Sequence, residues 1–296
     1  MNSPHVTVVV PTYNNASLLP ETIDKILAQS FTDFDLIIVD DGSSDDTAAV
    51  IRRGYPQVTY IAQSNRGPAA ARNAGVNVAR GEFIAFCDHD DLWQLDHLQA
   101  LLDGFAAHPD AALMFDNAEY FGAGVPAKKL HLDERAGRAL AAGPVSAKTL
   151  LWQYPIASMS VVMIRKKTFA AVGGLNERVG ALDDLHLYLR LAARYEARFV
   201  NFIGCRKRVS GSNLSQAINI KETNVCYLEQ LWRSHPEVVR AVGPLSFRLR
   251  LARKYFKLAR QYEQSGEASL AREMFRKAYR THFLNLRYFW HTLRAV

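Results

Sequence analysis

Strand-like and helix-like segments alternate through residues 1–115, and this alternation constrains the fold more than any other feature. Helical patterns over 16–29 and 68–79 separate apolar runs that are typical of buried strands. These runs are Val6–Val10, Asp35–Val39, Val58–Ile61 and Phe83–Cys87. Consecutive strands joined by helices pair in parallel, because the crossover returns the chain to the same edge of the sheet. The sequence therefore predicts an α/β domain with a Rossmann-like, mostly parallel sheet flanked by helices.

Beyond this region the pattern is mixed and then becomes helical. Strand-like runs at 112–121, 160–164 and 199–203 surround a loop-rich segment (123–147) and a helix over 182–195. From about residue 216 the chain is helical, with helices expected over 248–262 and 268–279 and a break at Ser265-Gly266. We therefore predict a domain over 1–215 made of two halves, 1–115 and 116–215. A helical, basic extension over 216–296 follows it.

The net charge of +7 belongs to the C-terminal extension. Residues 245–296 contain twelve Lys and Arg against three Glu, which leaves 24 basic and 26 acidic residues in the rest of the chain. The predicted domain therefore has no charge that would attract nucleic acid. The extension could lie on an anionic membrane through the face of Phe247, Leu251, Tyr255 and Leu258 and through the aromatic, basic stretch 283–293. The alternative is a helical cap whose charges are solvated.

The three cysteines are widely spaced and form neither a disulfide framework nor a zinc pattern, which favours a reducing cytoplasm. No apolar run approaches the roughly 20 residues of a membrane span, and no signal peptide precedes Val6. We therefore expect a cytoplasmic protein that can attach peripherally to the inner face of the membrane.

Acidic and polar residues follow three of the predicted strands. Asp88 and Asp90 follow one strand, Asp40-Asp41 a second, and Pro11-Thr12-Tyr13 the first. In parallel sheets ligands bind outside the carboxyl ends of the strands, so these groups should converge. Asp88 and Asp90 are hard oxygen ligands suited to Mg²⁺ or Mn²⁺ together with a diphosphate. Asp91 stands three residues before Gln94, the spacing of a helix capping box, and we predict that it caps a helix.

Several of these residues have two interpretations from pattern alone. Asp40 could form a turn or accept a hydrogen bond from a base or ribose, and Pro11–Tyr13 could form a strand exit or a wall beside a base. Arg72 could bind phosphate or simply carry a solvated charge. Asp183 and Asp184 could stabilise the first turn of a helix or supply a general base. The chain lacks a Gly-x-Gly-x-x-Gly or Walker loop, which argues against dehydrogenase and P-loop functions.

Taken in order, the motifs resemble those of the family 2 glycosyltransferases, the inverting group with a GT-A fold. The resemblance covers about residues 5–215. It rests on Val8–Asn14, Ile38–Asp45, Asn65-x-Gly67, Ala71-Arg72-Asn73-x-Gly75, Phe86-x-Asp88-x-Asp90-Asp91 (the DxD motif) and Gly173–Glu177 with Asp183–Arg190.

The resemblance makes 1–115 the nucleotide-sugar half and 116–215 the acceptor half, and it implies roles for particular residues. The donor would be a nucleotide-sugar, with a UDP-sugar favoured, bound by Pro11, Thr12, Tyr13, Asp40, Arg72 and Asp88. Asp90, helped by Asp88, would hold Mn²⁺ or Mg²⁺ against the diphosphate. Asp184 would be the catalytic base, although Asp183 replaces the Glu of the family's Glu-Asp pair and the choice between the two stays open. Ser210 stands where many relatives carry a His, which in some of them touches metal or diphosphate.

The resemblance also implies transfer of a single sugar to a hydroxyl of a glycan or lipid-linked acceptor in surface polysaccharide synthesis. The Gln-x-x-Arg-Trp motif of processive synthases is missing. Two alternatives remain: a catalytically silent module that binds nucleotide-sugar or glycan, and a nucleotidyltransferase, which would release pyrophosphate. The sequence does not identify the sugar, the acceptor, the linkage or the oligomeric state.

Overall fold

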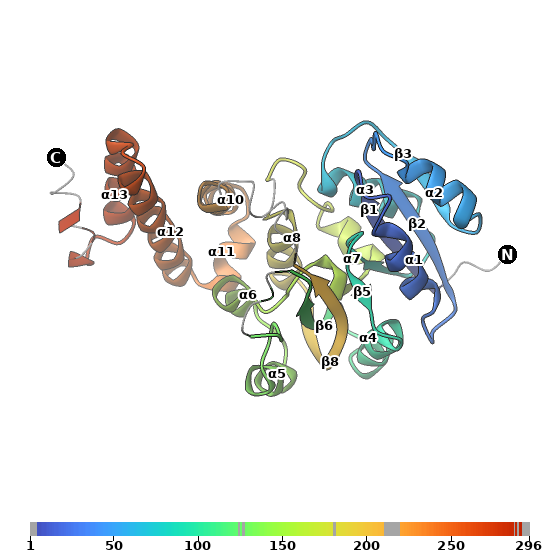
Figure 1. Cartoon of the computed structure of the whole chain (residues 1–296). Coiled ribbons are helices and arrows are strands. Elements are labelled where there is room, and N and C mark those ends of the chain that lie inside the picture. The colour runs from blue at the N-terminus through green and yellow to red at the C-terminus, as the bar shows by residue number, and fades with distance from the viewer. Residues whose placement is uncertain are drawn as a thin grey trace. The chain divides into compact units, whose positions relative to one another are not determined.

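The computed structural model describes residues 5–123, 125, 128–179, 182–209, 220–286, 288, 290 and 291. The chain forms two compact units, Met1–Asn213 and Leu214–Val296 (Figure 1). The predicted boundary between residues 215 and 216 lies outside the described residues, and the division of the first unit into a donor half and an acceptor half stays a prediction.

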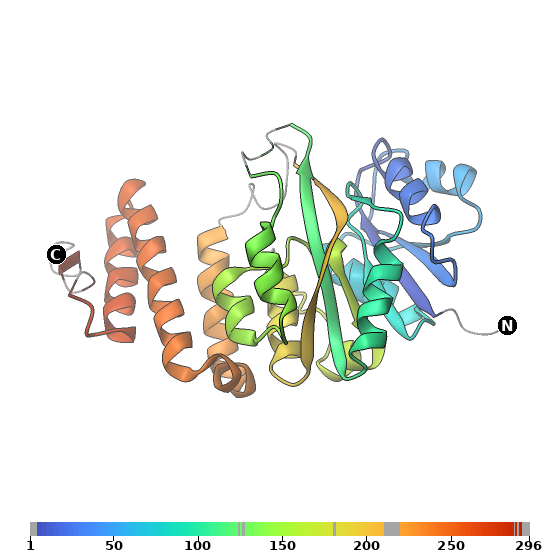
Figure 2. The ribbon, with the colours of Figure 1, turned by 90° about the horizontal axis from the view of Figure 1, so that it is seen from below.

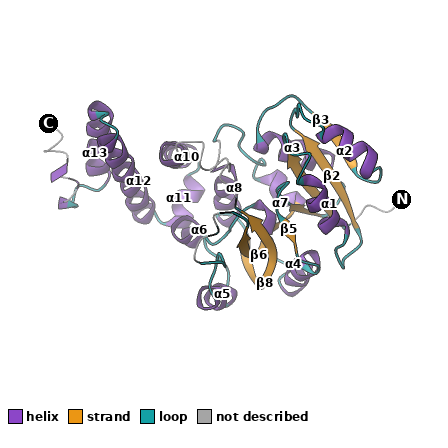
Figure 3. Ribbon diagram, in the orientation of Figure 1, coloured by secondary structure: helices purple, strands orange, loops and turns teal. Residues whose placement is uncertain are grey.

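The first unit contains a sheet and flanking helices (Figure 3). Its strands are β1 (Val6–Thr12), β2 (Phe34–Asp40), β3 (Thr59–Ala62), β4 (Phe83–Phe86), β5 (Leu92–Trp93), β6 (Ala111–Phe121), β7 (Val162–Arg165) and β8 (Glu196–Arg208). Its helices are α1 (Leu19–Leu27), α2 (Thr47–Gly54), α3 (Pro68–Val78), α4 (His97–Ala107), α5 (Glu134–Ala141), α6 (Ala147–Gln153), the 3-10 turn η1 (Met159–Val161), α7 (Lys166–Ala171) and α8 (Asp183–Ala192).

The strand order in the sheet is β3-β2-β1-β4-β7-β6-β8-β5. Strands β3, β2, β1 and β4 are parallel, as the alternating pattern predicts. β7 is antiparallel to both β4 and β6, and β8 is parallel to β6. Two reversals restore the original direction, so β6 and β8 run the same way as β1. The predicted mostly parallel α/β fold is confirmed, and the mixed pattern after residue 115 corresponds to the antiparallel insertion of β7.

This topology brings the ends of most strands that carry site residues to one edge of the sheet. The carboxyl ends of β1, β2, β4, β6 and β8 lie there, and so does the amino end of β7. β6 and β8 are long neighbouring strands, drawn in green and yellow-orange in Figure 2. β8 continues to Arg208, five residues beyond the strand that the sequence predicts. Those five residues bring additional basic side chains to the edge.

Close packing of α3 against the sheet depends on Gly75. A Cβ at this position would lie 2.4 Å from Cγ1 of Val9 on β1, far inside a normal contact. The small residues around Arg72 therefore do what the sequence suggests: they let the helix approach the sheet. As a result, Arg72 lies with 7% exposure beside the carboxyl end of β4.

A buried polar pair fixes the approach of α4 to the long strands. Nδ1 of His97 lies 2.8 Å from Oδ2 of Asp116 on β6, and neither side chain is exposed. A Cβ on Gly204 of β8 would lie 1.8 Å from the same Asp116 oxygen. Only glycine leaves room for the pair, so Gly204 is a packing requirement of this core.

The second unit consists of α10 (Ile220–Ser234), α11 (Pro236–Val242), α12 (Pro244–Gln264) and α13 (Ala268–Thr281). α12 packs against α10 and α13. The face predicted to meet a membrane is buried in this packing: Phe247, Leu251, Tyr255 and Leu258 are each at most 6% exposed. That part of the membrane prediction is wrong, because the apolar stripe of α12 forms the core of its own unit. Among the described residues, no helix is both long and apolar enough to cross a membrane.

Candidate active site

Of the three predicted donor residues at the end of β1, only one is exposed. Pro11 is buried and Thr12 is only 2% exposed, whereas Tyr13 is 47% exposed. Asn14, with a left-handed φ of 48°, fixes the loop that follows β1 against the end of β2. Its N–H donates to the Ser43 hydroxyl, and its side-chain oxygen accepts from the N–H of Ser44. Tyr13 is thus exposed at the end of the strand, while Pro11 and Thr12 are buried in β1.

Asp40 forms the turn that the pattern allows. Its Oδ1 accepts the N–H of Ser43 at 2.8 Å, and its Oδ2 accepts the phenol of Tyr60 at 2.6 Å. The turn interpretation is confirmed, and its role toward a donor base stays a prediction. Asp41 accepts the N–H groups of Arg66 and Gly67 at 2.9 and 2.7 Å, and so positions the loop that begins α3.

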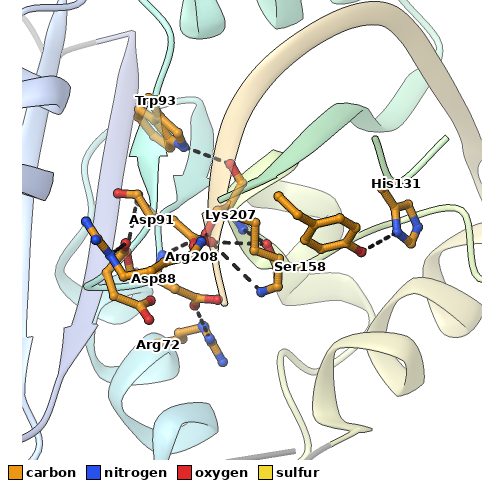
Figure 4. Close-up of polar contacts among 12 residues, drawn as sticks. Arg72, Asp88, Asp91, Trp93, His131, Ser158, Lys207 and Arg208 are labelled. Carbon is orange, nitrogen blue, oxygen red and sulfur yellow. Dashed lines mark hydrogen bonds and ion pairs between the residues drawn. The ribbon is translucent and has the colours of Figure 1, made fainter. Parts of the chain in front are cut away.

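Arg72 joins the acidic end of β4 to the start of α8. Its guanidinium lies 2.6 Å from Oδ1 of Asp88 and 3.3 Å from Oδ2 of Asp183. The Asp183 residue stands 111 positions farther along the chain than Arg72. Figure 4 shows Arg72 pointing at Asp88. The pattern allows Arg72 to bind phosphate or to carry a solvated charge. Its burial and its two ion pairs contradict the solvated charge, and the phosphate role stays a prediction.

The DxD carboxylates Asp88 and Asp90 have different surroundings. Burial alone would raise the pKa of Asp88, but the Arg72 guanidinium and the charge of Lys207 hold it below its usual range. Burial raises the pKa of Asp90, and the Asp88 carboxylate raises it further. In the described part of the chain no side chain forms an ion pair or hydrogen bond with the Asp90 carboxylate. Asp90 is therefore the carboxylate with oxygens available to a cation.

Asp91 does not cap a helix, so that prediction is wrong. It is 1% exposed and precedes β5, and α4 begins six residues later at His97. Its Oδ2 accepts the Ser160 hydroxyl at 2.6 Å, and its Oδ1 accepts the N–H of Arg208 at 2.9 Å. The Ser160 oxygen in turn accepts the N–H of Asp88 at 2.9 Å. Asp91 thus fixes the acidic loop to η1 and to the end of β8 (Figure 4).

The two carboxylates at the start of α8 are not equivalent. Asp183 is 5% exposed and paired with Arg72, whereas Asp184 is partly exposed and accepts the N–H of Leu185 at 2.6 Å. Burial raises the pKa of Asp184 to about 7, and the neighbouring Asp183 charge adds to the shift. A partly exposed carboxylate with a pKa near neutral pH has the properties of a general base. This geometry favours Asp184 over Asp183 for that predicted role.

A divalent cation fits this group of side chains only with additional ligands. Among the described residues, no three His, Cys, Asp or Glu side chains gather into a metal site. Mg²⁺ and Mn²⁺ sites of nucleotide enzymes commonly use one or two carboxylates, with substrate phosphates in the other positions. Asp90 and Asp88 match that donor set. Ser210, where relatives carry a possible ligand, lies outside the described residues.

Sequence reasoning missed Lys207 and Arg208. Both lie at the carboxyl end of β8, beyond the strand predicted over 199–203. Arg208 donates to the Asp90 carbonyl at 3.0 Å and pairs with Glu21 at 2.7 Å. Nζ of Lys207 lies 4.0 Å from Asp91. The run Arg206-Lys207-Arg208 has no apolar alternation, so only a pairing argument with β6 could have extended the strand to these residues.

A sequence model described as Glycosyl transferase family 2 matches residues 7–173, more than half of the chain. The chain belongs to glycosyl transferase family 2. The matched region contains the strand ends of β1, β2 and β4, the helix with Arg72, and the acidic residues Asp88 and Asp90. The predicted family is thereby confirmed.

Individual family 2 relatives and solved structures agree with this membership. The chain is 26% identical to chondroitin synthase of Escherichia coli over 228 residues, which cover 75% of this chain and 31% of that protein. It thus spans less than a third of the first curated relatives it matches. The fold matches S. aureus TarS 1-349 in complex with UDP-GlcNAc (TM-score 0.70, 15% identity, 98% of this chain and 88% of that one). It also matches the mannosyltransferase PcManGT of Pyrobaculum calidifontis in complex with GDP-Man and Mn²⁺ (TM-score 0.62, 21% identity, 99% and 84%). These likenesses establish the GT-A fold.

Proposed function

We propose that this family 2 protein is an inverting, metal-assisted glycosyltransferase. It would move one sugar from a nucleoside-diphosphate sugar, with a UDP-sugar favoured, to a hydroxyl of a glycan or lipid-linked acceptor. Surface polysaccharide synthesis is the setting that such acceptors suggest. The TarS complex with UDP-GlcNAc and the PcManGT complex with GDP-Man and Mn²⁺ support the donor class and the metal.

The observation that carries this proposal is the bridge made by Arg72. One guanidinium contacts Asp88 of the DxD motif and Asp183 at the start of α8. Arg72 thus connects Asp88, where we propose that the diphosphate binds, to a carboxylate pair in which burial raises the pKa of both members. A single displacement needs this arrangement: a base on the acceptor side and charge stabilisation on the leaving-group side.

In the proposed reaction Asp184 accepts the proton of the acceptor hydroxyl as that oxygen attacks the anomeric carbon. The bond from the anomeric carbon to the diphosphate breaks in the same step, and attack opposite the leaving group inverts the configuration. Asp183 keeps its place through Arg72, and its charge keeps Asp184 basic. Tyr13 and the Asp40 turn would hold the nucleoside at the ends of β1 and β2.

A divalent cation, held by Asp90 and Asp88, would supply positive charge to the leaving diphosphate. The charges of the site give a reason for it. Five carboxyl groups outnumber the three flanking cations Arg72, Lys207 and Arg208; these groups belong to Asp88, Asp90, Asp91, Asp183 and Asp184. A diphosphate adds more negative charge to this edge, so it should bind poorly until a cation compensates.

Asp90→Asn is expected to weaken Mn²⁺-dependent UDP binding strongly. Removing an outer-shell partner of a metal ligand typically costs about 10- to 100-fold in affinity, and losing the ligand itself should cost at least as much. Calorimetric titration of UDP with and without Mn²⁺ measures the effect. Asp96→Asn, an exposed change in the following turn, is the matched control. Equal Mn²⁺ enhancement in both variants would contradict the metal assignment.

A screen of nucleotide-sugars with Mn²⁺ tests the proposal as a whole. The protein is incubated with each donor, and the products are separated. A glycosyltransferase releases a nucleoside diphosphate, by transfer or by slow donor hydrolysis. Release of pyrophosphate would identify a nucleotidyltransferase instead, and binding without any release would identify a catalytically silent module.

We also propose that the second unit contacts an anionic membrane, where lipid-linked acceptors are found. Four apolar side chains after α13 are largely exposed: Phe283 (61%), Leu284 (74%), Leu286 (73%) and Trp290 (59%). Basic side chains, among them the exposed Arg276 and Arg280, lie on the preceding helix. Apolar and basic groups together favour an anionic lipid surface.

Replacing Leu284 and Leu286 with Glu is expected to abolish co-sedimentation with vesicles of anionic phospholipid. Each change removes apolar contact and adds a charge that the lipid repels. Leu95→Glu is the matched control, because Leu95 is also exposed (59%) but lies in the first unit. Binding that persists in the double variant, or that is insensitive to salt, would contradict the proposal.

A further inference from the structure

The ammonium group of Lys207 lies beside the acidic loop with its hydrogen-bond donors unused. Its Nζ is 4.0 Å from Oδ2 of Asp91, which is too far for a hydrogen bond. The Asp91 oxygens already accept the Ser160 hydroxyl and the N–H of Arg208. Among the described residues, none accepts a hydrogen bond from Lys207. An ammonium carries three N–H donors, so Lys207 has the capacity to bind an anion.

The other cations at this edge are already engaged. Arg72 forms ion pairs with both Asp88 and Asp183. Arg208 donates to the Asp90 carbonyl, pairs with Glu21 and lies 4.5 Å over the ring of Phe121. Both arginines therefore stabilise the architecture of the site. Lys207 differs from them: in the described part of the chain its ammonium lies near the Asp91 carboxylate but donates no hydrogen bond.

Lys207 remains charged beside the acidic loop. Burial would lower its pKa, but the carboxylates of Asp91, Asp88 and Asp90 outweigh burial and raise the pKa above its usual range. Its side chain is 24% exposed, so it is neither sealed in the core nor free in solvent. Its parallel-register neighbour is Tyr120 on β6, at the same edge as the end of β4.

We propose that Lys207 donates hydrogen bonds to the diphosphate of the donor and of the nucleoside diphosphate product. This inference rests on the proposed function and adds a leaving-group contact from β8. When the bond between the anomeric carbon and the diphosphate oxygen breaks, the bonding electrons stay on that oxygen, which Lys207 would contact. Lys207 offsets the charge that develops on that oxygen without transferring a proton.

The test compares UDP with uridine, each in the presence of Mn²⁺. Lys207→Met keeps the length of the side chain and removes its charge. We expect UDP binding to weaken by about 10- to 100-fold, the range for a hydrogen bond to a charged group, and uridine binding to stay unchanged. Calorimetry measures UDP, and competition against UDP measures uridine. Unchanged UDP affinity, or an equal loss for UDP and uridine, would overturn the inference.

A second variant separates a ligand contact from mere compensation of the buried Asp91 charge. Lys207→Met with Asp91→Asn removes both charges, so it also serves if Lys207→Met alone fails to fold. We expect the double variant to keep the weak UDP binding. Recovery of wild-type affinity would show that Lys207 only neutralises Asp91. A wild-type chain that binds neither UDP nor GDP with Mn²⁺ would overturn the proposed function itself, whereas normal wild-type binding with an unaffected variant overturns only the role of Lys207.

Discussion

Asp184→Asn is expected to reduce sugar transfer by about 10²- to 10⁴-fold, the usual contribution of a general base, while Mn²⁺-dependent UDP binding persists. The amide keeps the shape of the side chain and can still accept the N–H of Leu185, so the start of α8 should remain in place. Loss of turnover therefore reports proton transfer. The measurements are single-turnover rates with the donor and acceptor found by the screen, together with calorimetry of UDP.

The pH dependence of the transfer rate provides a second test of Asp184 as the base. Asp184 must be deprotonated to act as a base, and burial together with Asp183 raises its pKa to about 7. The transfer rate should therefore rise about tenfold per pH unit below 7 and level off above it. The Asp184→Asn variant should lose this inflection.

Asp183→Asn is the neighbouring control. It removes the charge that helps to raise the pKa of Asp184, so the inflection should move to lower pH with turnover retained. If Asp183→Asn abolishes transfer and Asp184→Asn leaves it nearly normal, then Asp183 is the base.

Arg72→Met is expected to lower the free energy of unfolding of the first unit by about 3–5 kcal/mol, because breaking a buried ion pair leaves charge without compensation. The side chains of Arg72 and Asp183 are 9% and 7% exposed, whereas that of Asp88 is 26% exposed and relies partly on solvent. Most of the loss should therefore come from Asp183. Urea unfolding followed by circular dichroism measures the effect.

Two controls make this expectation specific. Arg66→Met breaks the exposed pair with Glu177, whose side chains are 58% and 36% exposed, and should cost at most about 1 kcal/mol. Arg72→Lys keeps the charge but cannot span two carboxylates as a guanidinium does, so its loss should be intermediate. If Arg72→Met unfolds no more easily than Arg66→Met, the bridge does not contribute to stability.

The sequence predicts the structure correctly where the local residue pattern and the burial of the segment favour the same element. The run Val6–Val10 is fully or almost fully buried in a parallel strand, and the small residues around Gly75 allow close helix packing. Asp40 forms the turn that its neighbours indicate. The prediction that Asp91 caps a helix failed because a capping-box spacing is only a local signal. The Asp91 carboxylate instead accepts hydrogen bonds from the Ser160 hydroxyl and from the backbone N–H of Arg208, 117 residues away. The prediction that the apolar face of α12 meets a membrane failed because helical periodicity shows which face is apolar but not what covers it.

The order of the motifs by itself determined the family and the α/β fold, because strand periodicity, helix periodicity and the acidic strand ends are all encoded over short distances. Only the tertiary structure decided which carboxylates and cations act together. Arg72 reaches Asp183 across 111 residues, and Lys207 meets Asp91 through the pairing of β8 with β5 and β6. Such partnerships depend on strand order and register, which bring distant segments to one edge of the sheet. The same geometry separates Asp184, partly exposed beside the site, from Asp183, which is buried against Arg72.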